Sequence, residues 1–384
     1  MLIDLDRTPP PAPDRPRARR AAPASVTALL LLLVLLPPGA ASPGRLRELA
    51  TVLDTGATSS SVLTPDALYL ARPDGRIEAH PLTPGGPRWS VRVEAAEPGL
   101  TLAGSVLVVR PGAFFLDART GRELWRTPVP SVVHVLGDRV AYLDSDGLLR
   151  MADLGTGHVR WQRQTSERAL DGDPGHRYVL GIDDEERATL YSAADGAILA
   201  AGQSVDVDPY ALGLGQAVGQ VTDEFVGDVL YTHGQTSVAA YRLAGLAPIW
   251  QARIAEPTAL GACGNLICTT GDRGATAIDP ATGAVRWTSL RWRSIAPDGL
   301  AVANDLRVAR IDPATGRVRS ELGRGNLVDD LLLRYDWDRT FVTGLADSRV
   351  YGVIPVTALA DCTTAGDYLA CRTGDRSVTV WRVR

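Results

Sequence analysis

The sequence predicts an all-β protein in which short four-stranded antiparallel sheets repeat around a ring. Three observations support this prediction: a turn sequence that recurs at near-regular intervals, a hairpin signal inside each repeat, and a Trp at a fixed distance after most of the turns. Internal repeats with a period of roughly 20–50 residues are typical of proteins that stack one small structural unit many times. Each unit has too few strands to bury its own surfaces, so it must pack face to face against its neighbours.

The N-terminus has the features of a targeting segment. A Pro- and Arg-rich stretch over 1–23 precedes an apolar run from Ala24 to Leu36, and small residues follow up to Ala41. The run is short for a hydrocarbon core of roughly 30 Å. Two interpretations fit: an uncleaved signal-anchor over 24–41 with residues 1–23 as a cytoplasmic tail, or a signal peptide cleaved near Ala41. Both place the domain over 46–384 outside the cytoplasm.

The repeat is clearest in four turns, each with an Asp four residues before a Gly. These pairs are Asp117 and Gly121, Asp153 and Gly157, Asp279 and Gly283, and Asp312 and Gly316. In the first three a Trp stands four residues after the Gly, whereas the fourth has Ser320 there. Weaker copies are centred on Gly85, Gly196 and Gly245, and the copy at Gly245 has one extra residue before its Trp. The seven glycines are 36, 36, 39, 49, 38 and 33 residues apart.

Each residue of the turn has a physical role. The Asp side chain can accept hydrogen bonds from backbone N–H groups of the turn, and Gly supplies a positive φ. Before the Asp lie two alternating stretches joined by a hairpin signal, as at 73–75, 145–147 and 271–274. The Trp offers a large flat surface that can cover the join to the neighbouring sheet. This docking role is predicted for Trp89, Trp125, Trp161, Trp250 and Trp287.

These Asp-x-x-Thr-Gly-x-x-x-Trp units resemble the Trp-docking repeats of PQQ-like β-propellers, over about residues 58–384. The resemblance implies a β-propeller of four-stranded blades. It does not imply one activity, because such propellers include quinoprotein dehydrogenases, outer-membrane assembly scaffolds, sensor domains and many non-catalytic proteins.

The number of blades follows from the turns and from the C-terminal remainder. Seven turns give seven blades, and residues 325–384 add at least one more. We therefore predict eight blades, with seven as the alternative. The last segment stops before any such turn, so its outer strand is expected from Leu46–Leu53, which would close the ring. The long interval between Gly196 and Gly245 predicts an insertion at Val205–Val221 that elaborates one face of the ring.

The four cysteines lie in two local pairs, each across a predicted hairpin. Cys263 and Cys268 flank one turn, and Cys362 and Cys371 flank another. Three connectivities are possible, and the hairpins favour the disulfides 263–268 and 362–371. No metal site is predicted, since no C-x-x-C spacing is present and the five His are scattered.

The remaining motifs are interpreted as structural. Asp54-Thr55-Gly56 resembles an aspartic protease loop, but a single copy lacks the second carboxylate that this chemistry needs. Gly213–Gly219 has the wrong spacing for a nucleotide fingerprint. Acidic clusters at 144–146, 171–173 and 183–186 lack the ligand pattern of a Ca²⁺ loop and are expected in turns. No catalytic residue is predicted.

Two functions remain. The first is a non-catalytic, extracytoplasmic module, membrane-tethered and monomeric, that binds a protein or cell-surface partner without a cofactor. A net charge of −4 and a pI of about 5.8 argue against nucleic acid as the partner. The alternative, implied by the resemblance, is an alcohol or sugar dehydrogenase that uses PQQ and Ca²⁺. The alcohol-oxidising members carry adjacent cysteines, whereas the nearest spacing here is five.

Overall fold

The computed structural model describes residues 46–53, 60–95, 98–111, 113–128, 131–207, 224–271, 273–355, 359–374 and 377–384. The predicted tail, the apolar segment over 24–41, Asp54-Thr55-Gly56 and Gly213–Gly219 lie outside these ranges. Residues 44–384 form one compact unit. No helix in the described ranges has the length and apolarity needed to cross a membrane.

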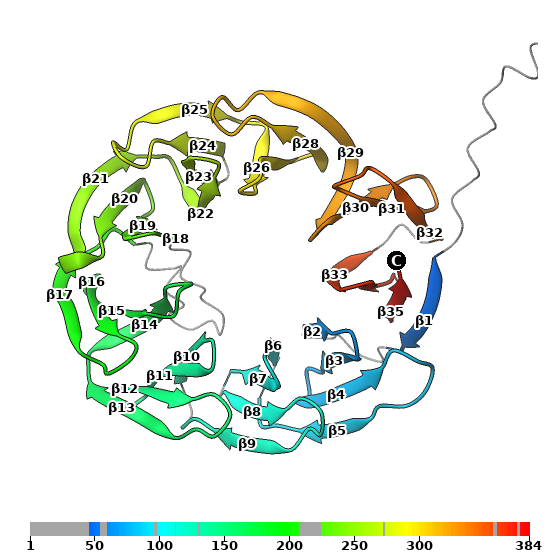
Figure 1. Cartoon of the computed structure of the whole chain (residues 1–384), viewed down its shortest axis with the longest axis horizontal. Coiled ribbons are helices and arrows are strands. Elements are labelled where there is room, and N and C mark those ends of the chain that lie inside the picture. The colour runs from blue at the N-terminus through cyan, green and yellow to red at the C-terminus, as the bar shows by residue number, and fades with distance from the viewer. Residues whose placement is uncertain are drawn as a thin grey trace, which may run out of the picture. The chain divides into compact units, whose positions relative to one another are not determined.

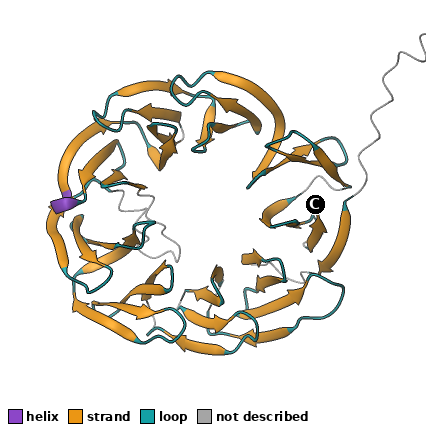
Figure 2. Ribbon diagram, in the orientation of Figure 1, coloured by secondary structure: helices purple, strands orange, loops and turns teal. Residues whose placement is uncertain are grey.

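The described elements are β-strands and one short 3₁₀ turn, η1 (Ala244–Leu246), and the strands form sheets arranged around a ring (Figures 1 and 2). The all-β prediction is therefore confirmed.

Six blades each consist of four consecutive antiparallel strands. Blade 1 is β2 (Ser60–Leu63), β3 (Ala67–Ala71), β4 (Arg76–Pro81) and β5 (Trp89–Arg92). Blade 2 is β6 (Gly99–Ala103), β7 (Val106–Arg110), β8 (Phe114–Asp117) and β9 (Glu123–Arg126). Blade 3 is β10 (Ser131–Leu136), β11 (Arg139–Asp144), β12 (Leu148–Asp153) and β13 (Val159–Gln164). Blade 4 is β14 (Glu167–Gly172), β15 (Tyr178–Asp183), β16 (Arg187–Ser192) and β17 (Ile198–Ser204). Blade 5 is β18 (Glu224–Val226), β19 (Val229–His233), β20 (Ser237–Arg242) and β21 (Ala247–Arg253). Blade 6 is β22 (Pro257–Cys263), β23 (Leu266–Gly271), β24 (Gly274–Ile278) and β25 (Val285–Ser289).

A seven-stranded sheet follows, and its middle strand belongs to two blades. The strands are β26 (Trp292–Ile295), β27 (Leu300–Ala303), β28 (Arg307–Ile311), β29 (Val318–Val328), β30 (Leu331–Tyr335), β31 (Thr340–Gly344) and β32 (Val350–Ile354). The first part of β29 pairs with β28 as far as Arg324, and the rest pairs with β30 from Gly325 onward. Blade 7 is thus β26–β28 with the first part of β29, and blade 8 is the rest of β29 with β30–β32.

The last sheet joins the two ends of the ring. β33 (Ala360–Ala365), β34 (Tyr368–Arg372) and β35 (Val378–Arg382) take β1 (Arg47–Val52) as their fourth strand. β1 pairs antiparallel with β35, with Val52 opposite Val378. The predicted role of Leu46–Leu53 as the closing strand agrees with this pairing. We call this sheet blade 9.

The described strands therefore contain nine four-stranded sets, not the eight, or alternatively seven, that the sequence predicted. The difference lies in residues 325–384, which form two blades where one was expected. Neither carries the Asp-x-x-Thr-Gly turn, so counting turns could not separate them.

The core lies between blades. The second and third strands of a blade are buried along most of their length, as in β7 and β11, whereas fourth strands such as β13 are largely exposed. Apolar clusters fill the joins between successive blades, including one between blades 9 and 1 that contains Leu70 and Val380. The sequence predicted alternating stretches at the second and third strands, whereas β7 and β11 are buried along nearly their whole length, because both faces of a blade pack against neighbouring blades.

Candidate functional site

Each predicted docking Trp lies on the fourth strand of one blade and reaches the turn of the next blade. The indole Nε1–H of Trp125 donates a 2.8 Å hydrogen bond to the carbonyl of Leu154, the residue after Asp153. The same bond joins Trp89 to Ala118, Trp161 to Ala193, Trp250 to Pro280 and Trp287 to Pro313, at 2.7–3.2 Å. One hydrogen bond and one flat ring thus link each of these five pairs of blades.

The turn glycine leaves room for the ring. A Cβ added to Gly157, whose φ is +70°, would lie 2.5 Å from the Trp125 ring. Gly121, Gly196, Gly283 and Gly316 stand in the same relation to their tryptophans, at 2.6–2.8 Å. The glycine is therefore required twice, for the positive φ and for the close approach of the indole.

The turn Asp side chains act as expected in three of the four cases. Asp117 Oδ1 accepts 2.8 Å hydrogen bonds from the backbone N–H and hydroxyl of Thr120, and these bonds lower the pKa of Asp117. Asp279 and Asp312 accept from backbone N–H groups of their own turns. Asp153 instead pairs with Arg160 on β13.

The join between blades 4 and 5 has a different filling. The docking position is Ala200, and the corresponding turn position is Leu246, four residues before Trp250, with a φ of +50°. Gly245, which the sequence suggested as the turn glycine with one residue inserted after it, instead faces open space. The Leu246 side chain is fully buried in the cluster against which Ala200 packs. A large residue in the turn thus replaces the large residue on the strand.

The join between blades 7 and 8 lacks a Trp as well. Its docking position is Ser320, and the corresponding carbonyl, that of Leu345, accepts a 3.0 Å hydrogen bond from Arg310 Nη2. Leu345 N–H bonds the preceding hairpin as Leu154 N–H does, which identifies the two positions as equivalent. A guanidinium therefore takes the hydrogen-bonding role of the indole.

Both local cysteine pairs are disulfides in the structure. Cys263 joins Cys268 between β22 and β23, and Cys362 joins Cys371 between β33 and β34. The second bridge lies in blade 9, the sheet that also contains β1.

The two faces of the ring differ in their loops. Because the strands of a blade alternate in direction, hairpins between second and third strands lie on the same face as the connections between blades. We call this the hairpin face, and the opposite one, with the Asp–Gly turns, the turn face. Three large apolar residues are at least 72% exposed among the described residues, and Leu53, Leu290 and Trp337 all lie on the hairpin face. Other exposed large apolar side chains in the same ranges reach 54% at most.

Of the predicted insertion at Val205–Val221, the structure describes Val205–Val207, which follow β17 on the hairpin face. This first part is not a loose loop, since Val205 and Val207 are buried. Asp206 accepts a 2.8 Å hydrogen bond from Gln251 and donates its backbone N–H to Tyr241 Oη. Residues 208–221 lie outside the described ranges.

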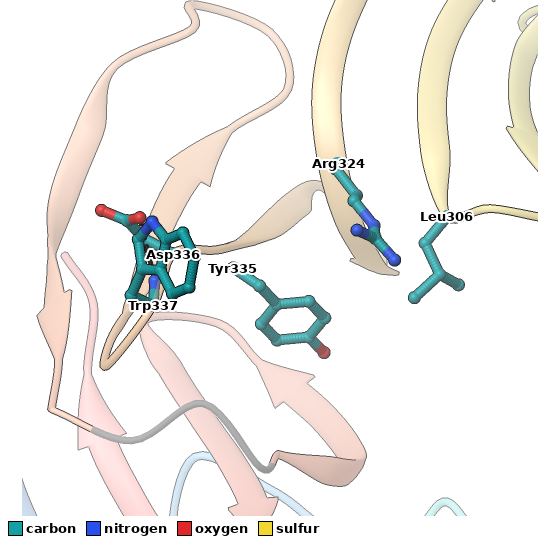
Figure 3. Close-up of a pocket in the computed structure, with 5 residues that line it drawn as sticks. All are labelled: Leu306, Arg324, Tyr335, Asp336 and Trp337. Carbon is teal, nitrogen blue, oxygen red and sulfur yellow. Dashed lines mark hydrogen bonds between the residues drawn. The ribbon is translucent and has the colours of Figure 1, made fainter.

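Two cavities on or near the hairpin face adjoin blade 8. One of about 380 Å³ is lined by Leu306, Arg324, Tyr335, Asp336 and Trp337 (Figure 3). The other, of about 310 Å³, borders the first strands of blades 7, 8 and 9 and includes Arg293 and Asn326. Tyr335 lines the first cavity and Asn326 the second, and the two residues lie on the paired strands β30 and β29, so the two cavities adjoin there.

A titratable cluster lies on the first strands of blades 3 to 5. His134 Nδ1 lies 3.5 Å from Asp171 Oδ1, and Gly172 leaves room for the imidazole. Burial lowers the pKa of His134 to about 4, and the Arg110 guanidinium adds to the effect. Burial raises the pKa of Asp171 to about 7, and the carboxylate of Glu224 adds to it. Near neutral pH the imidazole is therefore uncharged. Asp171 is therefore not in the solvated turn that the sequence predicted for its cluster, whereas Asp144, Asp173 and Asp183 do cap turns.

The described residues do not fit a Ca²⁺–PQQ centre. They contain no group of three or more His, Cys, Asp or Glu side chains placed to hold a metal ion. The His134–Asp171 pair offers one carboxylate and one imidazole, short of the six to eight oxygen ligands that Ca²⁺ takes. We derive no reaction through such a group.

Comparison with known proteins agrees with this architecture. The family described as outer membrane protein assembly factor BamB matches residues 73–289 and 184–327. The chain belongs to this family of PQQ-like β-propellers. A search of curated protein sequences finds no match.

Solved structures with the same kind of fold are distant in sequence. The computationally designed protein Ika8 is 14% identical, with a TM-score of 0.51, 88% of this chain covered and 100% of that one. BamB from Moraxella catarrhalis is 18% identical with a TM-score of 0.49, covering 88% and 97%. The C-terminal WD40 domain of Sif2 is 11% identical with a TM-score of 0.48, covering 89% and 99%.

Sequence reasoning missed the cavities beside blade 8. Trp337 follows no turn of the repeat, and this was a signal that it has a role other than docking. Arg324 gave no such signal, because its position depends on how β29 passes between two blades.

Proposed function

We propose that this chain is a non-catalytic, extracytoplasmic interaction module whose hairpin face binds a protein partner. The observation that supports this most directly is the placement of Leu53, Leu290 and Trp337, the most exposed large apolar side chains of the described residues, on that one face. The three side chains lie in separate loops, after β1, between β25 and β26, and between β30 and β31, and each offers apolar surface that a partner bound to this face would cover. Membership in a family described by an assembly factor also favours a protein partner.

Photo-crosslinking in cells tests this proposal. A photoreactive amino acid would replace Leu290 or Trp337 in the full chain, and Ala314, an exposed residue of a turn on the opposite face, would serve as control. We expect a discrete crosslinked product from positions 290 and 337 and none from 314. Equal crosslinking from all three positions would contradict a hairpin-face site.

The extracytoplasmic location is part of the proposal. The disulfides Cys263–Cys268 and Cys362–Cys371 form and persist in oxidising compartments. The apolar segment 24–41 would export the domain and, if uncleaved, anchor it as a single-pass protein; cleavage near Ala41 would release it. Thiol titration of the denatured, unreduced protein from cells should find no free thiol, and four free thiols would contradict this location.

We also propose that the module is monomeric and works without PQQ or Ca²⁺. The part of the proposal that concerns Ca²⁺ rests on the described residues, which contain no group of three or more His, Cys, Asp or Glu side chains placed to hold a metal ion. Titration with PQQ and Ca²⁺, followed by quinone absorbance, should show no saturable binding. Saturable binding with dye reduction by simple alcohols would instead support the dehydrogenase alternative.

A further inference from the structure

We propose that the two cavities beside blade 8 form one groove that binds a short acidic segment of a partner protein in an extended conformation. This inference rests on the proposed function and deepens it, because it names the chemistry of the partner at one part of the hairpin face. We call it the blade 8 groove: Leu306, Arg324, Tyr335, Asp336 and Trp337 at one end, and Arg293 with Asn326 at the other.

The groove results from the way β29 passes between blades. β29 runs without a break from blade 7 into blade 8, so no connecting loop covers this part of the hairpin face. The hairpin that contains Leu306 and the one that contains Trp337 then border the open space above Arg324 (Figure 3).

Two arginines that line the groove form no ion pair with a described residue, although two carboxylates line it as well. Asp361 pairs with Arg372 at 3.3 Å, and Asp336 Oδ1 accepts the backbone N–H of Trp337. Arg324 lies opposite Arg307 in the β28–β29 ladder, and like charges at directly opposite positions repel. Arg307 pairs with Asp305 at 3.1 Å, whereas Arg324 and Arg293 form no ion pair with another described residue. In a protein of net charge −4, most other arginines near this site are paired, including Arg310 and Arg339. An incoming carboxylate would relieve the repulsion between Arg307 and Arg324 and could take a bidentate hydrogen bond from Arg324.

The aromatic residues favour a protein segment over a simple anion. Trp337 is 98% exposed, and its backbone N–H is held by Asp336 Oδ1 at 2.9 Å. Tyr335 is half-buried and lines the same cavity. Trp, Tyr and Arg are the residue types that contribute most at protein interfaces. An apolar side chain of the partner would cover the Trp337 ring while its carboxylates meet Arg324 and Arg293.

The cavity on blade 6 shows the contrast. It has a volume of about 290 Å³ and lies on the same face, and two arginines line it: Arg273 pairs with Glu256 at 3.4 Å, whereas Arg253 forms no ion pair with a described residue. The difference lies in the aromatic residues, since none lines this cavity. We assign no acidic ligand to it.

Fluorescence anisotropy with the full chain tests the proposal. The probe is a short fluorescein-labelled peptide of Glu and Gly with one central Phe, and its Gln counterpart is the uncharged control. We expect saturable binding of the Glu peptide that weakens at high ionic strength, and no binding of the Gln peptide. No binding of the Glu peptide would overturn the acidic-segment proposal, while the crosslinking at positions 290 and 337 would still decide the proposed function separately.

Variants locate the binding. Loss of both guanidiniums in Arg293→Gln with Arg324→Gln should weaken the affinity about tenfold or more. Arg92→Gln, on the exposed end of β5 in blade 1, removes the same charge elsewhere and should leave the affinity unchanged. Trp337→Ala should weaken Glu-peptide binding, and Arg324→Lys should restore part of what Arg324→Gln loses. Equal affinity in all variants would overturn the groove as the site.

Two further measurements distinguish groove binding from unfolding of the variant and from recognition of a sugar. Arg324→Gln should leave the melting midpoint unchanged or raise it, because it removes repulsion from Arg307, so lost binding would not reflect unfolding. An oligogalacturonate competitor tests an acidic polysaccharide as the ligand. Binding of this sugar in place of the Glu peptide would overturn the protein-segment assignment.

Discussion

Two neighbouring joins of the ring solve the same packing problem in opposite ways. Between blades 3 and 4 the large residue is Trp161 on the strand and the small one is Gly196 in the turn. Between blades 4 and 5 the small residue is Ala200 on the strand and the large one is Leu246 in the turn. The space at the join is therefore filled in both cases, while the side that fills it is exchanged.

This comparison shows what the repeat constrains. Close packing requires that the join be filled, because an empty space of this size is costly. It does not require the indole. A Trp adds a hydrogen bond to the turn carbonyl, and where the Trp is absent that carbonyl can take another donor, as Arg310 does for Leu345.

Removal of a docking indole should have the largest effect. Trp125→Ala should lower the free energy of unfolding by about 3 kcal/mol, at the lower end for a large aromatic because the ring is only partly buried. Denaturant unfolding measures the loss. Trp337→Ala, at an exposed position with no docking role, is the control and should change stability by less than about 0.5 kcal/mol.

At the join between blades 4 and 5, stability should depend on Leu246 as it depends on the Trp at the other joins. Leu246→Ala should lower the free energy of unfolding by about 2–3 kcal/mol, since the side chain is fully buried. A more specific test of this comparison is the double variant Ala200→Trp with Leu246→Gly, which restores the Trp–Gly arrangement of the other joins. In a double-mutant cycle we expect a favourable coupling of about 1–3 kcal/mol. Additive losses would show that the two arrangements are not equivalent.

The two roles of the turn glycine, its positive φ and the room it leaves for the indole, can be tested separately. Gly157→Ala should cost about 2 kcal/mol more than Gly104→Ala, because a Cβ at 157 meets the Trp125 ring and one at 104 meets nothing within 4 Å. Both glycines have a positive φ, so the backbone strain is similar in the two variants. Equal losses of stability, measured by denaturant unfolding, would mean that the backbone conformation alone requires the glycine.

The smallest net effect concerns pH, because two contributions from the inner strands of blades 3 and 4 oppose each other. Asp171 holds its proton up to about pH 7 in the folded protein and up to about 3.8 when unfolded, so its contribution to stability falls as pH rises between these values. His134 is neutral above about pH 4 when folded and above 6.5 when unfolded, so its contribution rises with pH over that interval. The two slopes oppose each other in the native chain.

Single variants should therefore reveal opposite slopes. In Asp171→Asn, stability measured by thermal melts should increase from about pH 4 to about 6.5, and in His134→Gln it should decrease over the same range. Parallel pH profiles in the two variants would show that burial does not shift these groups in opposite directions.

Much of the fold was predictable because the repeat recurs in local sequence. The hairpin signals and the turns at Asp117 and Asp279 follow from patterns within a few residues. The closing strand near Leu49 was inferred from the last segment, which stops before any turn of the repeat. The count of blades was not predictable from turns, because blades 8 and 9 lack them. The candidate site could not be predicted from the sequence either. Nothing near Arg324 in the sequence indicates that Arg307 lies opposite it or that Tyr335 lines the same cavity.

The sequence by itself determined the unit, four short strands with a fixed turn and an aromatic ring, since these depend on backbone conformation and on hydrogen bonds between near neighbours. Only the tertiary structure decided how the units meet: that Leu246 fills the place of an indole, that β29 serves two blades, and that arginines without an ion pair among the described residues line a groove. Those features depend on which surfaces come together around the ring, and side chains many residues apart share a space that no local pattern records.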